Sequence, residues 1–175
     1  CHCLLQLFLS GSSQLLPTKI TDIYKMTVKM VFFNHNRESC SLKKLEKLKK
    51  THMYESFENF PEELRRVLYR LGEIAFRGIK EGRLLFESSE VEGLEDCGLL
   101  HKLPDVRPKR PLNDPPKSQF CFTHLTVQEF FAAKHLVDTK CNTKRKVERF
   151  VCNHINDGTW QVVLQFVAGL LKNLS

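Results

Sequence analysis

One short stretch of the sequence has residue types and spacing suited to binding an anion. Thr126 and Glu129 have the spacing of a capping box, which predicts a helix that begins at Thr126 and continues to Val137. His124 lies two residues before it, where free backbone N–H groups and the helix dipole favour an anion. An imidazole there can donate a hydrogen bond to a phosphate oxygen. Position alone favours a plainer interpretation, in which the histidine ends a strand and binds no ligand.

The rest of the chain offers little other chemistry. It contains no G-x-x-x-x-G-K-[ST] loop for nucleotide phosphates, no acidic Walker-B run and no Ser/His/Asp or Cys/His grouping. We therefore predict no catalytic residue and no ATP turnover by this chain alone. Its seven cysteines lack paired spacing, which predicts no metal site and a reducing, cytoplasmic location. Glu62, Glu63 and the acids of residues 90–95 are interpreted as helix-start charges, and His135 and His154 as structural.

The first part of the chain predicts helices separated by a linker. Residues 1–36 hold the end of one apolar helix, near residue 9, and a second helix that begins at Thr21 and Asp22. Residues 37–58 are polar and Lys-rich, and predict a linker with a short helix around residues 42–48. Proline and two acids at residues 61–63 then begin a helix whose apolar spacing continues to Ile79 and which ends at Gly82.

The middle of the chain predicts a small hairpin. A short helix is expected over Val91–Leu100, and residues 101–103 and 119–122 resemble two strands. Residues 84–86 fit either a strand or an extended connector. The loop 104–118 holds five of the seven prolines, which cannot continue a strand ladder or a helix. We expect a mainly α fold: a winged-helix domain over 59–139 with a small β-hairpin, flanked by helical segments at 1–36 and 140–175.

The net charge of +7 invites a nucleic-acid or membrane interpretation. The excess lies in three clusters, at residues 43–50, 107–117 and 140–146, which belong to connectors or helix starts. The two candidate recognition helices, Val91–Leu100 and Val127–Val137, are acidic or apolar, which argues against base contacts. The apolar opening is far shorter than the roughly 20 residues of a membrane span. Nucleic-acid binding by a winged helix stays open as an alternative, as does a scaffold without nucleotide contact.

The run from Phe120 to Val137, FCFTHLTVQEFFAAKHLV, closely resembles a motif of NOD-like receptors, F-x-H-[LST]-x-x-x-Q-E-F-F-A-A. In that family the motif spans the last strand and last helix of the winged-helix domain beside the NACHT ATPase. Three further stretches resemble the family in order and spacing. They are LPTKITDIY at 16–24, LGEIAF at 71–76 with LLF at 84–86, and WQVVLQFVAGLL at 160–171.

The resemblance implies a function that the amino-acid composition does not indicate. It places residues 1–36 at the end of the first helical domain, 37–58 in a linker, 59–139 in the winged-helix domain and 140–175 at the start of the second helical domain. His124 falls on the family's contact to the β-phosphate of ADP, which stabilises the autoinhibited state. ADP and ATP are expected only in an intact receptor, together with an upstream nucleotide-binding core and a downstream ligand-sensing region, leucine-rich repeats being the expected kind. Activation would produce a homo-oligomer in innate immune signalling.

Overall fold

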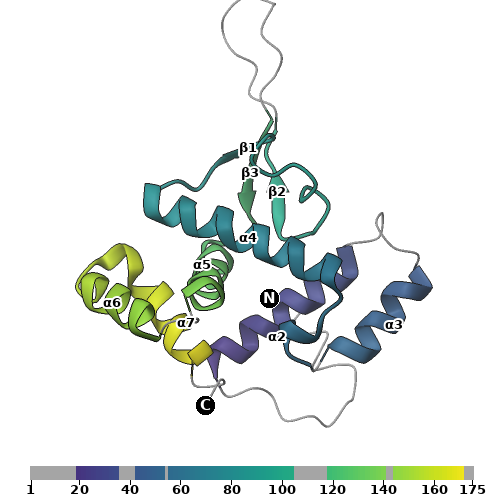
Figure 1. Cartoon of the computed structure of the whole chain (residues 1–175). Helices are drawn as coiled ribbons and strands as arrows, with labels where there is room; N and C mark the ends of the chain where they lie inside the picture. Colours follow the sequence, from purple (N-terminus) through teal and green to yellow (C-terminus); the bar gives the residue numbers. More distant parts are fainter. Residues whose placement is uncertain (1–18, 36–41, 54, 105–117, 141–143, 172–175) are drawn as a thin grey trace, which may run out of the picture.

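The computed structural model describes residues 19–35, 42–53, 55–104, 118–140 and 144–171. They form a mainly helical structure with a small three-stranded antiparallel sheet, which confirms the expected fold class. In Figure 1 the sheet lies above helix α4, helix α5 crosses below it, and helices α6 and α7 lie on the opposite side from α2 and α3. The predicted helix end near residue 9 and most of the proline-rich loop, residues 105–117, lie outside the described residues.

Helix α4, Glu62–Glu81, follows its sequence pattern closely. Pro61 precedes it and its carbonyl accepts the first helical hydrogen bond, while Glu62 and Glu63 lie against the positive end of the dipole. Gly82 ends the helix with φ 65°, a left-handed conformation that glycine adopts without steric cost. One apolar stripe faces the core, and its buried members are Leu64, Leu68, Leu71, Ile74, Ala75 and Ile79.

The sheet consists of β1, Phe86–Glu87, β2, Leu100–Lys102, and β3, Gln119–Phe122, in the order β1-β3-β2. Both pairings are antiparallel, with Phe86 opposite Phe120 and Leu100 opposite Phe122. Phe120 and Phe122 lie two residues apart, so both face the core, as a strand's alternation requires. The two predicted hairpin strands are confirmed, and the apolar run at 84–86 is a connector except for its last residue, which enters β1.

The helix predicted over Val91–Leu100 is wrong. Residues 91–99 form consecutive turns, and Leu100 already belongs to β2. Gly93 and Gly98 both have φ 74°, which an α-helix cannot accommodate. Val91 and Leu94 are nevertheless 0% and 1% exposed, because the turns bring them to the core in place of helical spacing.

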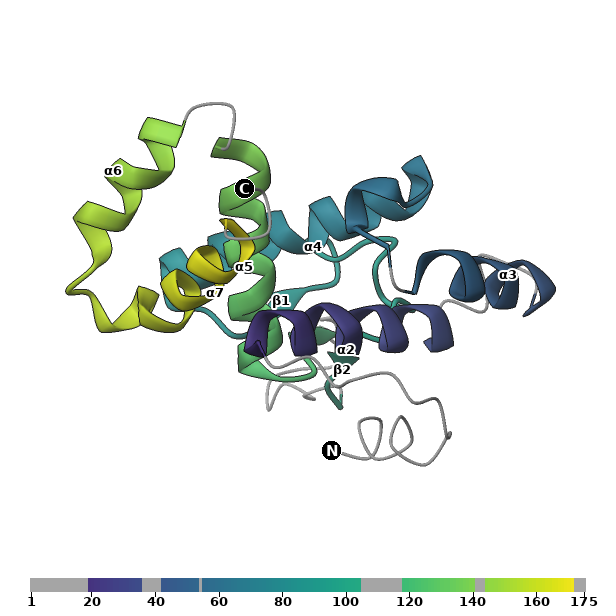
Figure 2. The same cartoon turned by 90° about the horizontal axis from the view of Figure 1, so that it is seen from below.

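Helix α5, Leu125–Lys140, is the centre of the molecule (Figures 1 and 2). It contacts α4, α7, α6, α2 and β3. The middle turns of α5 are surrounded by these elements, so most of their residues are apolar. Five of its residues are 0% exposed: Phe130, Phe131, Ala132, Ala133 and Leu136.

The remaining helices surround this centre. They are α2, Ile20–His35; α3, Leu42–His52; the short 3₁₀ helix η1, Phe57–Asn59; α6, Lys144–His154; the 3₁₀ helix η2, Gly158–Trp160; and α7, Gln161–Leu171. Thr21, expected at a helix cap, lies inside α2 and is 2% exposed. Ile155 follows the end of α6 and is 63% exposed.

The domain boundaries proposed from the sequence stay predictions, but apolar contacts cross them. The ring of Tyr24, in α2, meets that of Phe166, in α7, edge-on with centroids 5.0 Å apart. Phe57, in the expected linker, is 7% exposed and its ring lies 6.5 Å from that of Phe130. None of the helices within the described residues combines the length and apolarity needed to cross a bilayer.

Candidate functional site

His124 lies between the end of β3 and the start of α5. Its carbonyl accepts hydrogen bonds from the backbone N–H groups of Val127 and Gln128, at 3.0 and 3.3 Å. The helix therefore begins at Leu125, and His124 itself is the cap residue. The predicted capping box is wrong in this respect, because Thr126 lies inside the first turn and its hydroxyl has other partners.

The imidazole of His124 is exposed and held by its Nδ1 atom. The backbone N–H of Thr126 donates to Nδ1 at 3.2 Å, which is the side-chain capping contact of this helix. The Thr126 hydroxyl also lies 2.6 Å from Nδ1. Within the described part of the chain no residue forms a hydrogen bond with the other ring nitrogen, Nε2. The ring therefore has one fixed nitrogen and one that is open to a ligand.

Helix α2 contributes a third polar group to this site. The hydroxyl of Tyr24 donates to the Thr126 hydroxyl oxygen at 2.6 Å, across 102 positions of sequence. The Tyr24 ring is half-buried, stacked on Phe130 with centroids 6.2 Å apart and edge-on to Phe166. Aromatic packing thus positions the hydroxyl that reaches the start of α5.

Glu129 places a carboxyl group close behind His124. The residue is 8% exposed, and within the described residues its carboxylate has no hydrogen-bond or ion-pair partner. Burial raises the pKa of Glu129, whereas the nearby charge of His124 acts in the opposite direction. The site therefore contains an acid that is more readily neutral than an exposed one.

Other residues of the motif are structural. Gln128 is 1% exposed and its side-chain amide donates to the Arg83 carbonyl at 3.1 Å, which joins α5 to the connector after α4. Sequence reasoning missed this role. His154 stacks on Phe150 with centroids 4.1 Å apart, and His135 lies 5.5 Å from the rings of Tyr69 and Phe76. The Nδ1 atom of His154 also lies 2.8 Å from the Phe150 carbonyl oxygen.

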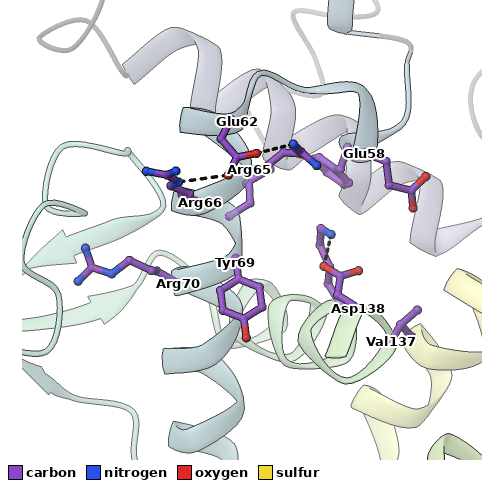
Figure 3. Close-up of a pocket in the computed structure, with 11 residues that line it drawn as sticks. Glu58, Glu62, Arg65, Arg66, Tyr69, Arg70, Val137 and Asp138 are labelled. Atoms are coloured by element: carbon purple, nitrogen blue, oxygen red, sulfur yellow. Dashed lines mark hydrogen bonds and ion pairs between the residues drawn. The ribbon is translucent and has the colours of Figure 1, made fainter. Parts of the chain in front are cut away.

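A cavity of about 610 Å³ lies at the other end of α5, among η1, α4 and the last turns of α5 (Figure 3). Asp138 lies thirteen positions after Leu125, which at 1.5 Å per residue is about 20 Å along the helix. Glu62 pairs with Arg65 and Arg66 at 2.5 and 3.2 Å, and Lys134 pairs with Asp138 at 2.6 Å. This cavity was not predicted from the sequence, because its lining comes from three separate segments.

No protein-family model matches this chain. No three His, Cys, Asp or Glu side chains within the described residues are grouped to hold a metal ion. The site is thus defined by its geometry: an exposed histidine that caps a 16-residue helix, with one ring nitrogen directed to protein and the other to solvent.

Proposed function

We propose that this chain is the regulatory winged-helix and helical region of a NACHT-type NOD-like receptor, and that His124 donates a hydrogen bond to the β-phosphate of ADP held by an upstream core. The observation that supports it most is the exposed ring of His124 at the cap of α5. The helix dipole and the imidazole both favour an anion at this position. The motif around His124 is what connects this chemistry to ADP.

The neighbourhood of His124 fits a phosphate group. A charged carboxylate beside a phosphate would repel it, and burial of Glu129 favours the neutral form of that acid. A hydrogen bond to a charged group contributes about 1.5–3 kcal/mol. Loss of such a contact would raise the open population roughly ten- to a hundredfold, which is enough to shift a two-state switch.

The packing of α5 supports movement of this region as one unit. The helix contacts α4 and β3 on the winged-helix side and α6 and α7 on the helical side. Interiors packed this closely move as rigid bodies more readily than they deform. In the proposal, release of the phosphate contact lets the unit swing away from the core, whose surface then becomes available for homo-oligomerisation. Catalytic groups for nucleotide hydrolysis belong to the core, not to this region.

The test is a His124→Asn change in the receptor that carries this region. Asparagine is a favoured cap residue, so α5 keeps its start while the outward ring nitrogen is lost. We expect faster ADP release and background signalling raised roughly ten- to a hundredfold. His101→Asn, at an exposed position of β2, is the matched control and should change neither. Unchanged ADP retention and unchanged background signalling in His124→Asn would refute the proposal.

The nucleic-acid alternative loses support in physical terms. Residues 91–99 form turns, so that candidate recognition helix is not formed. The other candidate, α5, is buried over seven consecutive residues, Val127–Ala133, and could not enter a groove without unfolding the core. A gel shift with duplex DNA should show only weak binding that salt abolishes. A scaffold without nucleotide contact remains the second alternative, and the His124→Asn test separates it from the proposal.

A further inference from the structure

The geometry points to Tyr24 and Thr126 as positioning residues that fix the tautomer of His124. This tautomer makes the outward Nε2 of His124 a hydrogen-bond donor. The arrangement requires α2 to be docked against α5. The role of this donor toward phosphate rests on the proposed function. The tautomer itself does not, because it follows from contacts within the chain.

The first step concerns the inner ring nitrogen. An imidazole nitrogen that accepts a hydrogen bond carries no proton, and in a neutral ring the proton then lies on the other nitrogen. The backbone N–H of Thr126 can only donate, and it points at Nδ1 from 3.2 Å. Nδ1 is therefore the acceptor and Nε2 carries the proton.

The second step concerns the Thr126 hydroxyl, which could donate to Nδ1 or accept from it. The Tyr24 hydroxyl donates to Thr126 Oγ1 at 2.6 Å. Since Nδ1 carries no proton, the Thr126 hydroxyl must donate to it, also at 2.6 Å, and the Thr126 oxygen accepts from Tyr24. Tyr24, Thr126 and His124 thus form a chain of hydrogen bonds that runs in one direction and reinforces the Nε2–H tautomer.

The third step concerns the origin of Tyr24. It belongs to α2, and it packs between Phe130 of α5 and Phe166 of α7. Separation of α2 from α5 would remove the donor to Thr126, and the hydroxyl would be free to turn away from Nδ1. The outward donor of His124 therefore depends on the contact between α2 and the remainder of the fold, which links ligand affinity to helix docking.

The test is nitrogen NMR of the whole chain with labelled histidine at about pH 8, where an ordinary imidazole is neutral. His124→Asn assigns the resonances by removing them. We expect the Nε2–H form to dominate at His124. Thr126→Val should move the tautomer ratio toward Nδ1–H by roughly two- to tenfold, the equivalent of one neutral hydrogen bond. Tyr24→Phe keeps the ring packing and should shift the ratio in the same direction by less.

Two further variants make the result specific. Thr126→Ser retains the hydroxyl and should preserve the wild-type ratio, and Tyr69→Phe, which removes a hydroxyl at the distant cavity, should leave it unchanged. A dominant Nδ1–H form in the unaltered chain, or equal ratios in Thr126→Val, Tyr24→Phe and the unaltered chain, would overturn the inference. The tautomer is measured without nucleotide, so failure of the ADP-retention test alone would sink the proposed function and leave the positioning roles intact.

Discussion

The two ends of α5 differ in how they accommodate charge. At its C-terminal end, Lys134 pairs with Asp138 and lies over the ring of Phe57, while the ammonium of Lys29 approaches the same ring from α2. Lys29 is 6% exposed, and its Nζ donates to the carbonyls of Met53 and Glu55. The charged groups of Lys29, Lys134 and Asp138 thus each have a partner.

At the N-terminal end, the carboxyl of Glu129 is near the charge of His124 but has no hydrogen-bond or ion-pair partner within the described residues, and the exposed ring of His124 keeps one nitrogen open. A carboxyl group removed from water without a hydrogen-bond or ion-pair partner costs stability, and groups of this kind are common at ligand sites. We therefore assign a structural role to the cavity end of α5 and ligand binding to its His124 end. Each prediction below changes one side of this comparison.

The largest effect is expected from Lys29. Burial, followed by the charge of Lys25, lowers the pKa of Lys29 from 10.5 to about 8, while Glu55 acts in the opposite direction. Between these values the unfolded chain binds a proton that the folded chain does not, so the free energy of unfolding rises with pH. We expect the rise to be up to about 3 kcal/mol between pH 8 and pH 10.5, relative to Lys29→Met.

Urea denaturation at several pH values measures this difference. Lys50→Met removes an exposed lysine and should retain the rise with pH. An identical pH dependence in Lys29→Met and the unaltered chain would contradict the buried-ammonium assignment.

Gly78→Ala is the next largest change and acts on the His124 end. A Cβ there would lie 2.6 Å from the Gln128 side-chain nitrogen and 2.7 Å from the Phe86 ring, so both must move. Overpacking of this kind costs about 2 kcal/mol after the better helix propensity of alanine is included. Thermal unfolding would show it as a lower Tm. Gly158→Ala meets no atom within 4 Å and should leave the Tm nearly unchanged.

The sequence predicted best where local signals agree. In α4, a proline start, first-turn acids, an apolar stripe and a glycine stop all indicated the same helix, and the helix has those bounds. The prediction from the sequence failed over residues 91–99. Apolar spacing there indicated a helix, but Gly93 and Gly98 have left-handed backbone conformations. Periodicity alone cannot report a backbone conformation that only glycine adopts so readily.

The position of the candidate site was predicted from the sequence, but its hydrogen-bond partners were not. The histidine at a helix start was evident from the order of residues around Thr126, yet the cap is His124 itself. The Thr126 hydroxyl bonds to Tyr24, which is 102 residues away and which no local pattern could connect to it. The cavity at the other end also depends on contacts among η1, α4 and α5. Such arrangements are set by tertiary packing, so local spacing does not contain them.

Glu129→Gln sharpens the comparison by removing the unpartnered carboxylate. Burial raises the pKa of Glu129 above its unfolded value, so the carboxylate destabilises the fold as pH rises through the folded pKa. We expect the glutamine variant to be more stable by about 1 kcal/mol at neutral pH, a gain that disappears below about pH 4. Glu92→Gln, at an exposed position, is the control and should show no such gain in urea denaturation. A loss of stability at neutral pH would mean that the carboxylate has a stabilising partner after all.

The smallest effect is expected at the rim of the cavity, from Glu62→Gln. Glu62 pairs with two arginines of the same helix at 2.5 and 3.2 Å, and its side chain is 58% exposed. Solvent weakens such pairs, and its place in the first turn of α4 adds a modest dipole term, so the cost should be about 0.5–1 kcal/mol. Because both contributions are electrostatic and exposed, about 1 M salt should remove most of this difference, whereas the gain from Glu129→Gln should persist. Equal salt sensitivity of the two variants would show that Glu129 is hydrated in solution, and the contrast between a screened rim and a buried unpartnered acid would not hold.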